Sequence, residues 1–490
     1  MKGVCAAGHP LSAEAGARIL RDGGNAVDAA IAAMLTSWVC EPLLTGPGAG
    51  GYLLVAGAEE EPTLLDFFVA APGDGADPDA RGDLVAVDVD FGDAVQVFHV
   101  GGAACGVPGN PAGVAEAARR WGTIPLADLA APAAALARAG TPLNETQAFI
   151  AKILAGILTS TPEACAVFAP GGDLLQDGDT LRSPELGDTI ERLGAEGAAP
   201  FYTGEVAERV VDWVGRHGGT LTARDLAAYA PVARTPVSAT YRGRDVLTNP
   251  PPNAGGVLLA LALAQLDRSG TGPPRLQDVV DAMRAAQAER TAEFTTGLAD
   301  EAFARGFVAS RLGSTTHISV MDAEGRAATV TCTNGEGSGL VVPGLGIHVN
   351  NIMGEEDLSP LGFHRAAPGT RMPSMMAPTV VLQDGEVVLT LGSAGSNRIR
   401  SAILQTIVGV VDHGMAAEEA VEAPRAHFES GVVYAEPGVP VEELRGDFDI
   451  TRFRARNVFF GGVQAIERDP ATGALTGAGD PRRGGAAVAA

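Results

Sequence analysis

The stretch from Gly313 to Asn334, GSTTHISVMDAEGRAATVTCTN, carries the clearest structural pattern in the chain. Polar and apolar side chains alternate on both sides of the turn at 322–325, which predicts a β-hairpin because successive side chains of a strand point to opposite faces. A three-residue loop that ends in a left-handed Gly325 sets the register. The expected cross-strand pairs are Val320 with Ala328, Ser319 with Thr329, Ile318 with Val330, His317 with Thr331, Thr316 with Cys332 and Thr315 with Thr333.

Two hydroxyl side chains, those of Thr315 and Thr333, should therefore face each other at the open end of the hairpin, with Cβ atoms about 5 Å apart. One interpretation is structural, since threonine favours strands and a threonine-rich face can be solvated or paired with another strand. The other is catalytic, because a threonine hydroxyl becomes nucleophilic beside a base. Its own α-amino group, with a pKa of about 7.7–8.0, is such a base when the chain is cut just before it. The small residues Gly313 and Ser314 suit that junction.

Composition excludes several other functions. The 490 residues are 46% hydrophobic and 19% charged, which is typical of a globular protein with a large core. A net charge of −24 disfavours nucleic acid and anionic membranes as partners. Lys2 and Lys152 are the only lysines, which disfavours pyridoxal-type chemistry. Five scattered cysteines suggest neither disulfides nor a zinc site, so no metal and no cofactor is predicted.

Nothing in the sequence divides the chain, so we expect residues 1–490 to form a single domain. No apolar run reaches the ~18 residues of a membrane span, and the N-terminus lacks the apolar segment of a signal peptide. A soluble cytoplasmic protein is the simplest prediction, and a secreted protein that has lost its signal is the alternative. The oligomeric state is left open.

Grouped helices and strands predict a layered α/β or α+β arrangement rather than a doubly wound sheet. Ser12 is expected to cap a helix through Asp22, and Asn25 to cap a second helix that ends before Pro42. Further helices are expected near 112–120, 127–139, 144–159, 205–217, 256–267 and 275–293. Strands are expected near 51–56, 63–68, 245–248, 315–322, 326–333, 379–382 and 386–391.

Several familiar motifs are absent or out of context. Gly46, Gly48 and Gly51 match GxGxxG, but no strand precedes them and the strand-like YLLV follows, so a tight turn that packs backbone against backbone is the better interpretation. There is no GxSxG elbow and no HExxH pair. A metal-dependent hydrolase is the weakest alternative, because its candidate ligands lack ligand spacing. They are His317, His348, His364 and His427.

A series of segments in fixed order carries a family resemblance. They are HPLSAEAGARILRDGGNAVDAAIAA at 9–33, then GVPGNPAGV, PFYTGEVAE, NPPPNAGG, the hairpin, NNIMGEEDL, RMPSMMAPT, GSAGSNRIR and AGDPRR. Over nearly its whole length the chain resembles the γ-glutamyltransferase (γ-glutamyltranspeptidase) family of N-terminal-nucleophile hydrolases. The resemblance implies an α+β fold, a four-layer αββα sandwich.

It also implies a precursor that cuts itself before Thr315 into a large subunit, 1–314, and a small subunit, 315–490, which stay together. By the same resemblance Thr315 is the nucleophile and Thr333 supports its hydroxyl and amine. Gly395 and Ser396 fall where the family has the Gly-Gly pair of its oxyanion hole, and a backbone N–H survives the change to serine if φ allows it.

The expected substrate pocket departs from the glutathione-cleaving members of the family. Asp77 falls near the position of an arginine that binds the glutamate α-carboxylate, and Met375 replaces the second of two serines of which Ser374 is the first. Ile352 and Glu355 fall at the positions that hold the α-amino group. Loss of a bidentate arginine removes about 1.5–3 kcal/mol, so a glutamyl group should fit poorly.

Two further features concern the mouth of the site. The loop 334–339 is two residues shorter than usual and carries Glu336, which is either a ligand for a substrate amine or a solvated carboxylate. Asn334 beside it is a further candidate substrate ligand. The segment after Glu355 is too short for the family's lid, so bulkier amides should enter.

The leading hypothesis is a threonine amidohydrolase or acyltransferase that acts on a small-molecule amide or peptide, with water or an amine as acceptor. A genuine γ-glutamyltransferase or glutathione hydrolase is the first alternative. The second is an uncleaved, catalytically silent homologue that binds a ligand or a partner.

Overall fold

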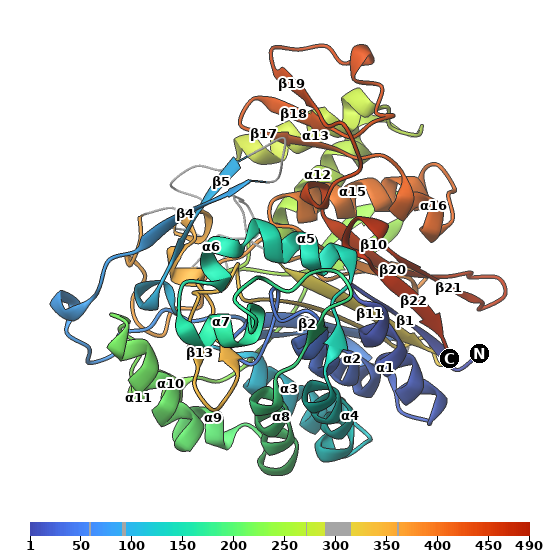
Figure 1. The fold of residues 1–490 in the computed structure, drawn as a ribbon. Helices are drawn as coiled ribbons and strands as arrows, with labels where there is room; N and C mark the ends of the chain where they lie inside the picture. The colour runs from blue at the N-terminus through green and yellow to red at the C-terminus, as the bar shows by residue number, and fades with distance from the viewer. Residues whose placement is uncertain (58–59, 91–94, 271, 290–314, 360–361) are drawn as a thin grey trace.

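The computed structural model describes residues 1–57, 60–90, 95–270, 272–289, 315–359 and 362–490. Two β-sheets pack face to face at its centre, with helices on both outer faces (Figure 1). This is the α+β, four-layer arrangement that the sequence predicts.

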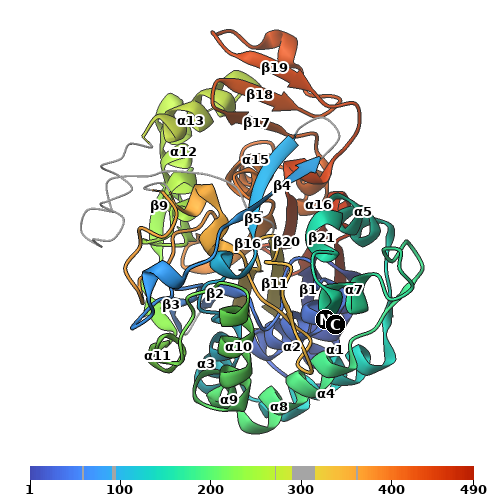
Figure 2. The same cartoon turned by 60° about the vertical axis from the view of Figure 1, so that its left-hand side comes forward.

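The first sheet has the order β22-β1-β11-β12-β2-β3-β8. Its strands are β1 (Gly3–Ala7), β2 (Gly50–Gly57), β3 (Glu60–Phe67), β8 (Val232–Arg234), β11 (Thr316–Asp322), β12 (Ala327–Thr333) and β22 (Ala486–Ala489). β1 pairs with β22, so the two chain ends lie side by side, as both views show (Figures 1 and 2).

The second sheet has the order β21-β20-β16-β15-β10-β9. Its strands are β9 (Val237–Tyr241), β10 (Arg244–Thr248), β15 (Thr379–Gln383), β16 (Glu386–Ala394), β20 (Gly462–Arg468) and β21 (Leu475–Gly479). Smaller strands lie outside the two main sheets: β4 (Val85–Asp90), β5 (Val95–Val100), β6 (Thr141–Pro142), β7 (Thr180–Leu181), β13 (Val341–Val342), β14 (Ile347–His348), β17 (Ala426–Glu429), β18 (Val432–Ala435) and β19 (Asp449–Arg452).

Helices cover the first sheet on one side and the second sheet on the other (Figure 1). The first layer holds α1 (Pro10–Arg21), α2 (Ala26–Cys40), α3 (Asn110–Trp121), α4 (Leu126–Ala139), α8 (Pro184–Glu196), α9 (Ala199–Thr203), α10 (Glu205–Arg216) and α11 (Ala223–Ala228). The second holds α12 (Gly255–Ser269), α13 (Leu276–Ala288), α15 (Arg398–Val411) and α16 (Ala417–Glu422), and α5 (Glu145–Ile153), α6 (Ala155–Leu158) and α7 (Pro162–Phe168) form a separate group. The helices and strands expected from sequence are found with bounds shifted by a few residues, except that the expected helix at 144–159 is divided into α5 and α6 at Leu154. The expected helix at 275–293 runs partly outside the described residues.

Helix capping confirms one prediction and corrects another. Asn25 caps α2 in a capping box with Asp28. Helix α1 starts earlier than expected, because the His9 ring accepts the Leu11 N–H at 3.2 Å. Ser12 lies inside the helix and is fully buried, with its hydroxyl 3.3 Å from Cys40 Sγ.

The hairpin has the predicted register at every pair from Thr316–Cys332 to Val320–Ala328. Its apolar face, including Ile318 and Val330, packs on the first helical layer. Its polar face is neither solvated nor paired with another strand: it is buried against the second sheet. Close approach of the two sheets is possible because residue 392 is glycine; a Cβ there would lie 2.2 Å from the His317 ring.

Within this polar layer every side chain bonds to a neighbour. His317 Nδ1 lies 2.7 Å from the Thr331 hydroxyl, and its Nε2 lies 3.0 Å from the hydroxyls of Ser319 and Thr329. Ser319 donates to the Gln464 carbonyl of the second sheet at 3.1 Å. Burial lowers the pKa of His317 to about 3 from its usual 6.5, so the ring is neutral at physiological pH.

The neutral ring makes stability depend on pH. Below pH 6.5 the His317 ring of the unfolded protein binds a proton, whereas the buried ring of the folded protein stays neutral. The free energy of unfolding therefore falls as the pH drops from 6.5 towards 3. Relative to pH 7.5, this loss should reach about 2 kcal/mol at pH 5. Urea unfolding of the Thr315→Ala chain at both pH values measures it. The Thr315→Ala protein that also carries His317→Asn should lose about 2 kcal/mol less stability between pH 7.5 and pH 5. An equal loss in both proteins would contradict a neutral, buried His317.

The glycine-rich turn at 46–51 behaves as the sequence predicts. A Cβ at Gly48 would lie 2.3 Å from the His348 carbonyl oxygen, and one at Gly51 would lie 2.5 Å from that of Thr331. These glycines serve close backbone packing. No helix among the described residues has the length and apolar character needed to cross a bilayer.

Candidate active site

A cavity of about 250 Å³ opens at the end of the hairpin where β11 begins and β12 ends. Thr315 and Thr333 both line it, and they are 2% and 4% exposed. The remaining lining residues are Phe68, Ile352, Glu355, Leu358, Ser374, Met375, Met376, Ser396 and Ile399. The cavity therefore brings together seven of the residues singled out from sequence: Thr315, Thr333, Ile352, Glu355, Ser374, Met375 and Ser396.

Thr333 is held by the turn that follows it, because its Oγ1 accepts the Gly335 N–H at 2.8 Å. Thr315 is the first described residue after the segment 290–314, so the Gly313-Ser314 junction lies outside the described residues. The register of β11 and β12, continued by one residue, places the two threonines opposite each other.

The loop between β16 and α15 supplies Gly395 and Ser396. Both have left-handed φ values, 103° and 68°, of which the second is uncommon for a residue with a side chain. Serine accepts this conformation at a modest cost, and the loop reaches the cavity through Ser396. The glycine-to-serine change at 396 is thus compatible with the backbone.

Ser374 is prepared to donate a hydrogen bond. Its Oγ accepts one from Asn253 Nδ2 at 2.6 Å and one from the Met376 N–H at 3.1 Å. A hydroxyl has two acceptor sites and one donor, so its O–H remains for a third partner. Asn253 and Phe68 were not singled out from sequence, since their distance of more than a hundred residues from Ser374 or Thr315 leaves no local signal.

Three other predicted ligands do not line the cavity. Asp77 is exposed, and its carboxylate caps the short turn Pro78–Ala80 by accepting the Asp79 N–H at 3.0 Å. Asn334 is fully buried, and neither polar atom of its side-chain amide has a hydrogen-bond partner in the described part of the chain. Glu336 is 1% exposed, which corrects the alternative of a solvated loop carboxylate. Its negative charge lies close enough to Arg483 to act on the pKa of that group.

A buried carboxylate that sequence reasoning missed lies beside the start of β11. Glu41, at the end of α2, accepts the Thr316 hydroxyl through Oε1 at 3.0 Å and is 1% exposed. Burial raises its pKa to about 7, against the opposing effects of Thr316 and Arg483. The signal in the sequence was only the acidic residue before Pro42.

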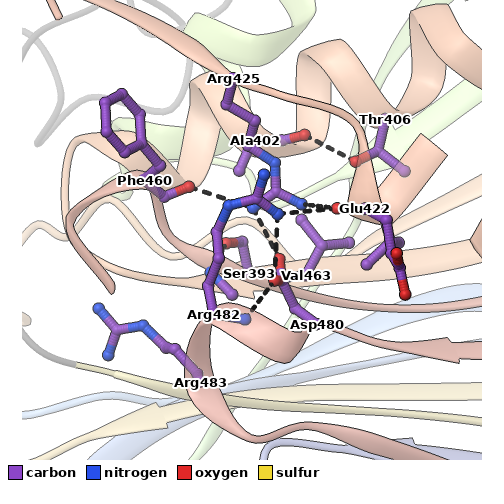
Figure 3. Close-up of polar contacts among 12 residues, drawn as sticks. Ser393, Ala402, Thr406, Glu422, Arg425, Phe460, Val463, Asp480, Arg482 and Arg483 are labelled. Atoms are coloured by element: carbon purple, nitrogen blue, oxygen red, sulfur yellow. Dashed lines mark hydrogen bonds and ion pairs between the residues drawn. The ribbon is translucent and has the colours of Figure 1, made fainter. Parts of the chain in front are cut away.

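A cluster of buried ions anchors the last turn of the chain (Figure 3). Asp480 pairs with Arg425 at 2.7 Å and with Arg482 at 3.2 Å, and Arg482 also contacts Glu436 at 2.5 Å. The two arginines hold the pKa of the Asp480 carboxyl below its usual value against the effect of burial. The cluster fixes the strand β20 beside the loop that carries Gly395.

Asp480→Asn should therefore be strongly destabilising. The amide keeps the shape but leaves two buried guanidinium groups without a shared counter-charge, and loss of one buried partner costs about 3–5 kcal/mol. Thermal or urea unfolding measures the loss. The matched control is Glu386→Gln, which removes an exposed partner of Arg468 and should cost less than about 1 kcal/mol. Similar small losses in both would contradict the role of the cluster.

Among the described residues no group of three or more His, Cys, Asp or Glu side chains is arranged to hold a metal ion. The four histidines considered for such a site lie on separate segments, β11, β14, β17 and the loop at 364.

Comparison with known proteins agrees with this geometry. The sequence model of gamma-glutamyltranspeptidase matches residues 12–312 and 299–490. The chain belongs to the γ-glutamyltranspeptidase family. Two relatives that align with nearly all of this family member are named for different activities. The glutathione hydrolase proenzyme of Bacillus subtilis (strain 168) is 31% identical, and the match covers 99% of this chain and 91% of the relative's length. The acylase ACY 1 proenzyme of Pseudomonas sp. (strain SE83) is 32% identical, and the match covers 100% of this chain and 93% of the relative's length.

Solved structures extend the similarity to the whole fold. The cephalosporin acylase from Bacillus halodurans superposes with a TM-score of 0.83 at 27% identity, covering 100% of this chain and 96% of its own. A γ-glutamyltranspeptidase of Helicobacter pylori covers 61% of this chain and 88% of its own, with a TM-score of 0.51 at 29% identity. This family member is thus a hydrolase or transferase with the N-terminal-nucleophile hydrolase fold, similar to both acylases and glutathione hydrolases.

Proposed function

We propose that this protein is a self-cleaving threonine amidohydrolase whose preferred acyl group lacks a free α-carboxylate. The observation that carries the proposal is the composition of the cavity. Of the described residues that line it, Glu355 is the one with a charge, and six others are apolar. A glutamyl α-carboxylate would meet a carboxylate and no cation, whereas a neutral acyl chain would bury apolar surface.

The chemistry follows from the two threonines. After cleavage before Thr315, its α-amine takes the Oγ1 proton while Oγ1 forms a bond to the substrate carbonyl carbon. Backbone N–H groups of the Gly395–Ser396 loop would stabilise the resulting oxyanion. The amine then gives the proton to the departing nitrogen, the C–N bond breaks, and an ester on Thr315 remains for water or an amine to resolve.

The remaining polar groups suit the orientation of a neutral amide. Ser374 has a hydroxyl hydrogen to donate, and Thr333 borders the same cavity as the nucleophile. Similarity to an acylase proenzyme and to a cephalosporin acylase supports an acyl group other than glutamyl. Similarity to glutathione hydrolases supports the alternative, ordinary γ-glutamyl transfer.

A pair of anilide substrates distinguishes the proposed amidohydrolase from a γ-glutamyltransferase directly. The matured protein should hydrolyse a neutral pentanoyl anilide much faster than a γ-glutamyl anilide. The opposite order would favour the glutathione hydrolase, and failure to hydrolyse either by a cleaved chain would count against amidohydrolase activity on acyl groups of this size.

A further inference from the structure

Arg483 is a buried cation that has no ion pair with the described residues. It is 6% exposed, its Nη2 donates to the Val458 carbonyl at 3.1 Å, and its Nε has no hydrogen-bond partner there. Figure 3 shows its guanidinium pointing away from Asp480, with which its neighbours Arg425 and Arg482 pair. A buried arginine without an ion pair is costly, which calls for an explanation.

Residues of three segments near Thr315 lie within packing or electrostatic reach of this guanidinium. A Cβ on Gly395 would lie 3.2 Å from Nη2, so Arg483 packs beneath the oxyanion loop. Its charge acts on Glu41, whose carboxylate holds the Thr316 hydroxyl directly after the nucleophile. It also interacts with Glu336, in the loop that follows Thr333.

We propose that Arg483 is a positioning residue whose charge favours the neutral, basic form of the Thr315 α-amine in the cleaved enzyme. This inference rests on the proposed function. A nearby cation makes protonation of an amine less favourable, so it lowers the pKa of the amine. Only the neutral amine can accept the proton that Thr315 Oγ1 loses when it attacks the carbonyl carbon.

Other charges around the nucleophile act in the opposite direction. Glu41, Glu336 and Glu355 would each favour the protonated amine, and Asp480 would do so weakly because Arg425 and Arg482 share its charge. Burial raises the pKa of Glu41 to about 7, which reduces its charge near neutral pH. Burial of Thr315 itself acts in the same direction as Arg483. Removal of the Arg483 charge raises the amine pKa directly. It also raises the pKa of Glu41, and the smaller charge on that carboxylate offsets part of the shift.

The experiment is a pH profile of kcat/KM for an anilide substrate. Arg483→Met keeps much of the apolar stem and removes the charge, so the acid limb should move to higher pH by about one unit. The alkaline plateau should stay within about threefold of wild type. Arg483→Lys should restore the wild-type limb. Arg216→Met, which removes an exposed charge from α10, should leave the whole profile unchanged.

A purely structural role gives a different result. If Arg483 only supports the oxyanion loop, Arg483→Met lowers kcat equally at every pH and leaves the limb in place, which overturns the proposal. An uncut wild-type chain would overturn the proposed function itself, whereas a cut, active enzyme with an unmoved limb would overturn only this inference.

A second measurement needs no variant, and it keeps the proposal falsifiable if Arg483→Met does not mature. Cyanate carbamylates neutral amines, so the pH dependence of inactivation of the wild-type enzyme reports the pKa of the Thr315 amine. We expect a value below the ordinary range of about 7.7–8.0. A value within or above that range would overturn the proposal.

Discussion

Thr315→Ala should leave the protein as one chain of 49.8 kDa, whereas the wild-type protein should be recovered as fragments 1–314 and 315–490. In the proposed mechanism the Thr315 hydroxyl attacks the preceding carbonyl, so without it no ester forms and the peptide bond stays intact. Activity should fall below detection, because neither the nucleophile nor the free α-amine is generated. Intact-mass analysis and an anilide assay on the same samples measure both effects.

Conservative variants separate the hydroxyl from the fold. Thr315→Ser keeps a hydroxyl and should still yield both fragments, though more slowly. Thr333→Ala removes the partner across the hairpin, together with the Oγ1 that accepts the Gly335 N–H, and should slow cleavage or turnover without unfolding the protein. Complete cleavage of Thr315→Ala would show that another group cuts the chain. Wild-type chains that stay uncut after long incubation would favour the silent homologue.

Substrate preference should be the second large effect. A glutamyl α-carboxylate loses a charge-assisted contact worth about 1.5–3 kcal/mol, and apolar Ile352 and Met375 replace polar contacts that are each worth about 1 kcal/mol. The total is about 3–5 kcal/mol, or roughly two to three orders of magnitude in kcat/KM, with incomplete additivity between neighbours. The kcat/KM of the matured protein for a pentanoyl anilide should therefore exceed that for a γ-glutamyl anilide by roughly two to three orders of magnitude.

Met375→Ser provides a matched test of the cause. A second hydroxyl beside Ser374 should raise the kcat/KM for the γ-glutamyl anilide by about tenfold, because it supplies one hydrogen bond, and should lower that for the pentanoyl anilide. Efficient turnover of glutathione by the wild-type protein, with a micromolar KM, would contradict this interpretation and restore glutathione hydrolysis.

Local patterns in the sequence predicted the hairpin well, for a physical reason. Its register depends on a short turn and on alternation over a few residues, and both are visible in the segment itself. The same holds for Asn25, whose capping bonds reach only two and three residues ahead. The fold class followed from the grouping of such elements and from the family resemblance.

Contacts between distant segments could not be predicted in this way. Glu41 and Thr316 are 275 positions apart, and a strand pattern says nothing about which helix end faces it. Glu336 was predicted to be either a ligand for a substrate amine or a solvated carboxylate, whereas the structure buries it within electrostatic reach of Arg483. Asp77 was placed by the order of motifs, which does not determine where a loop side chain points.

The order of strands in the first sheet has a consequence for genetics. β11 and β12 come from the later part of the chain, yet they bond to β1 on one side and to β2 on the other, and both of these come from the earlier part. In a continuous chain these strands are already joined, so each molecule supplies both pieces in equal numbers. A piece made on its own would expose the strand edges that the other piece covers, and exposed edges favour aggregation. We therefore expect an intact copy of one piece, made from a second gene, to complement a defect in that piece poorly.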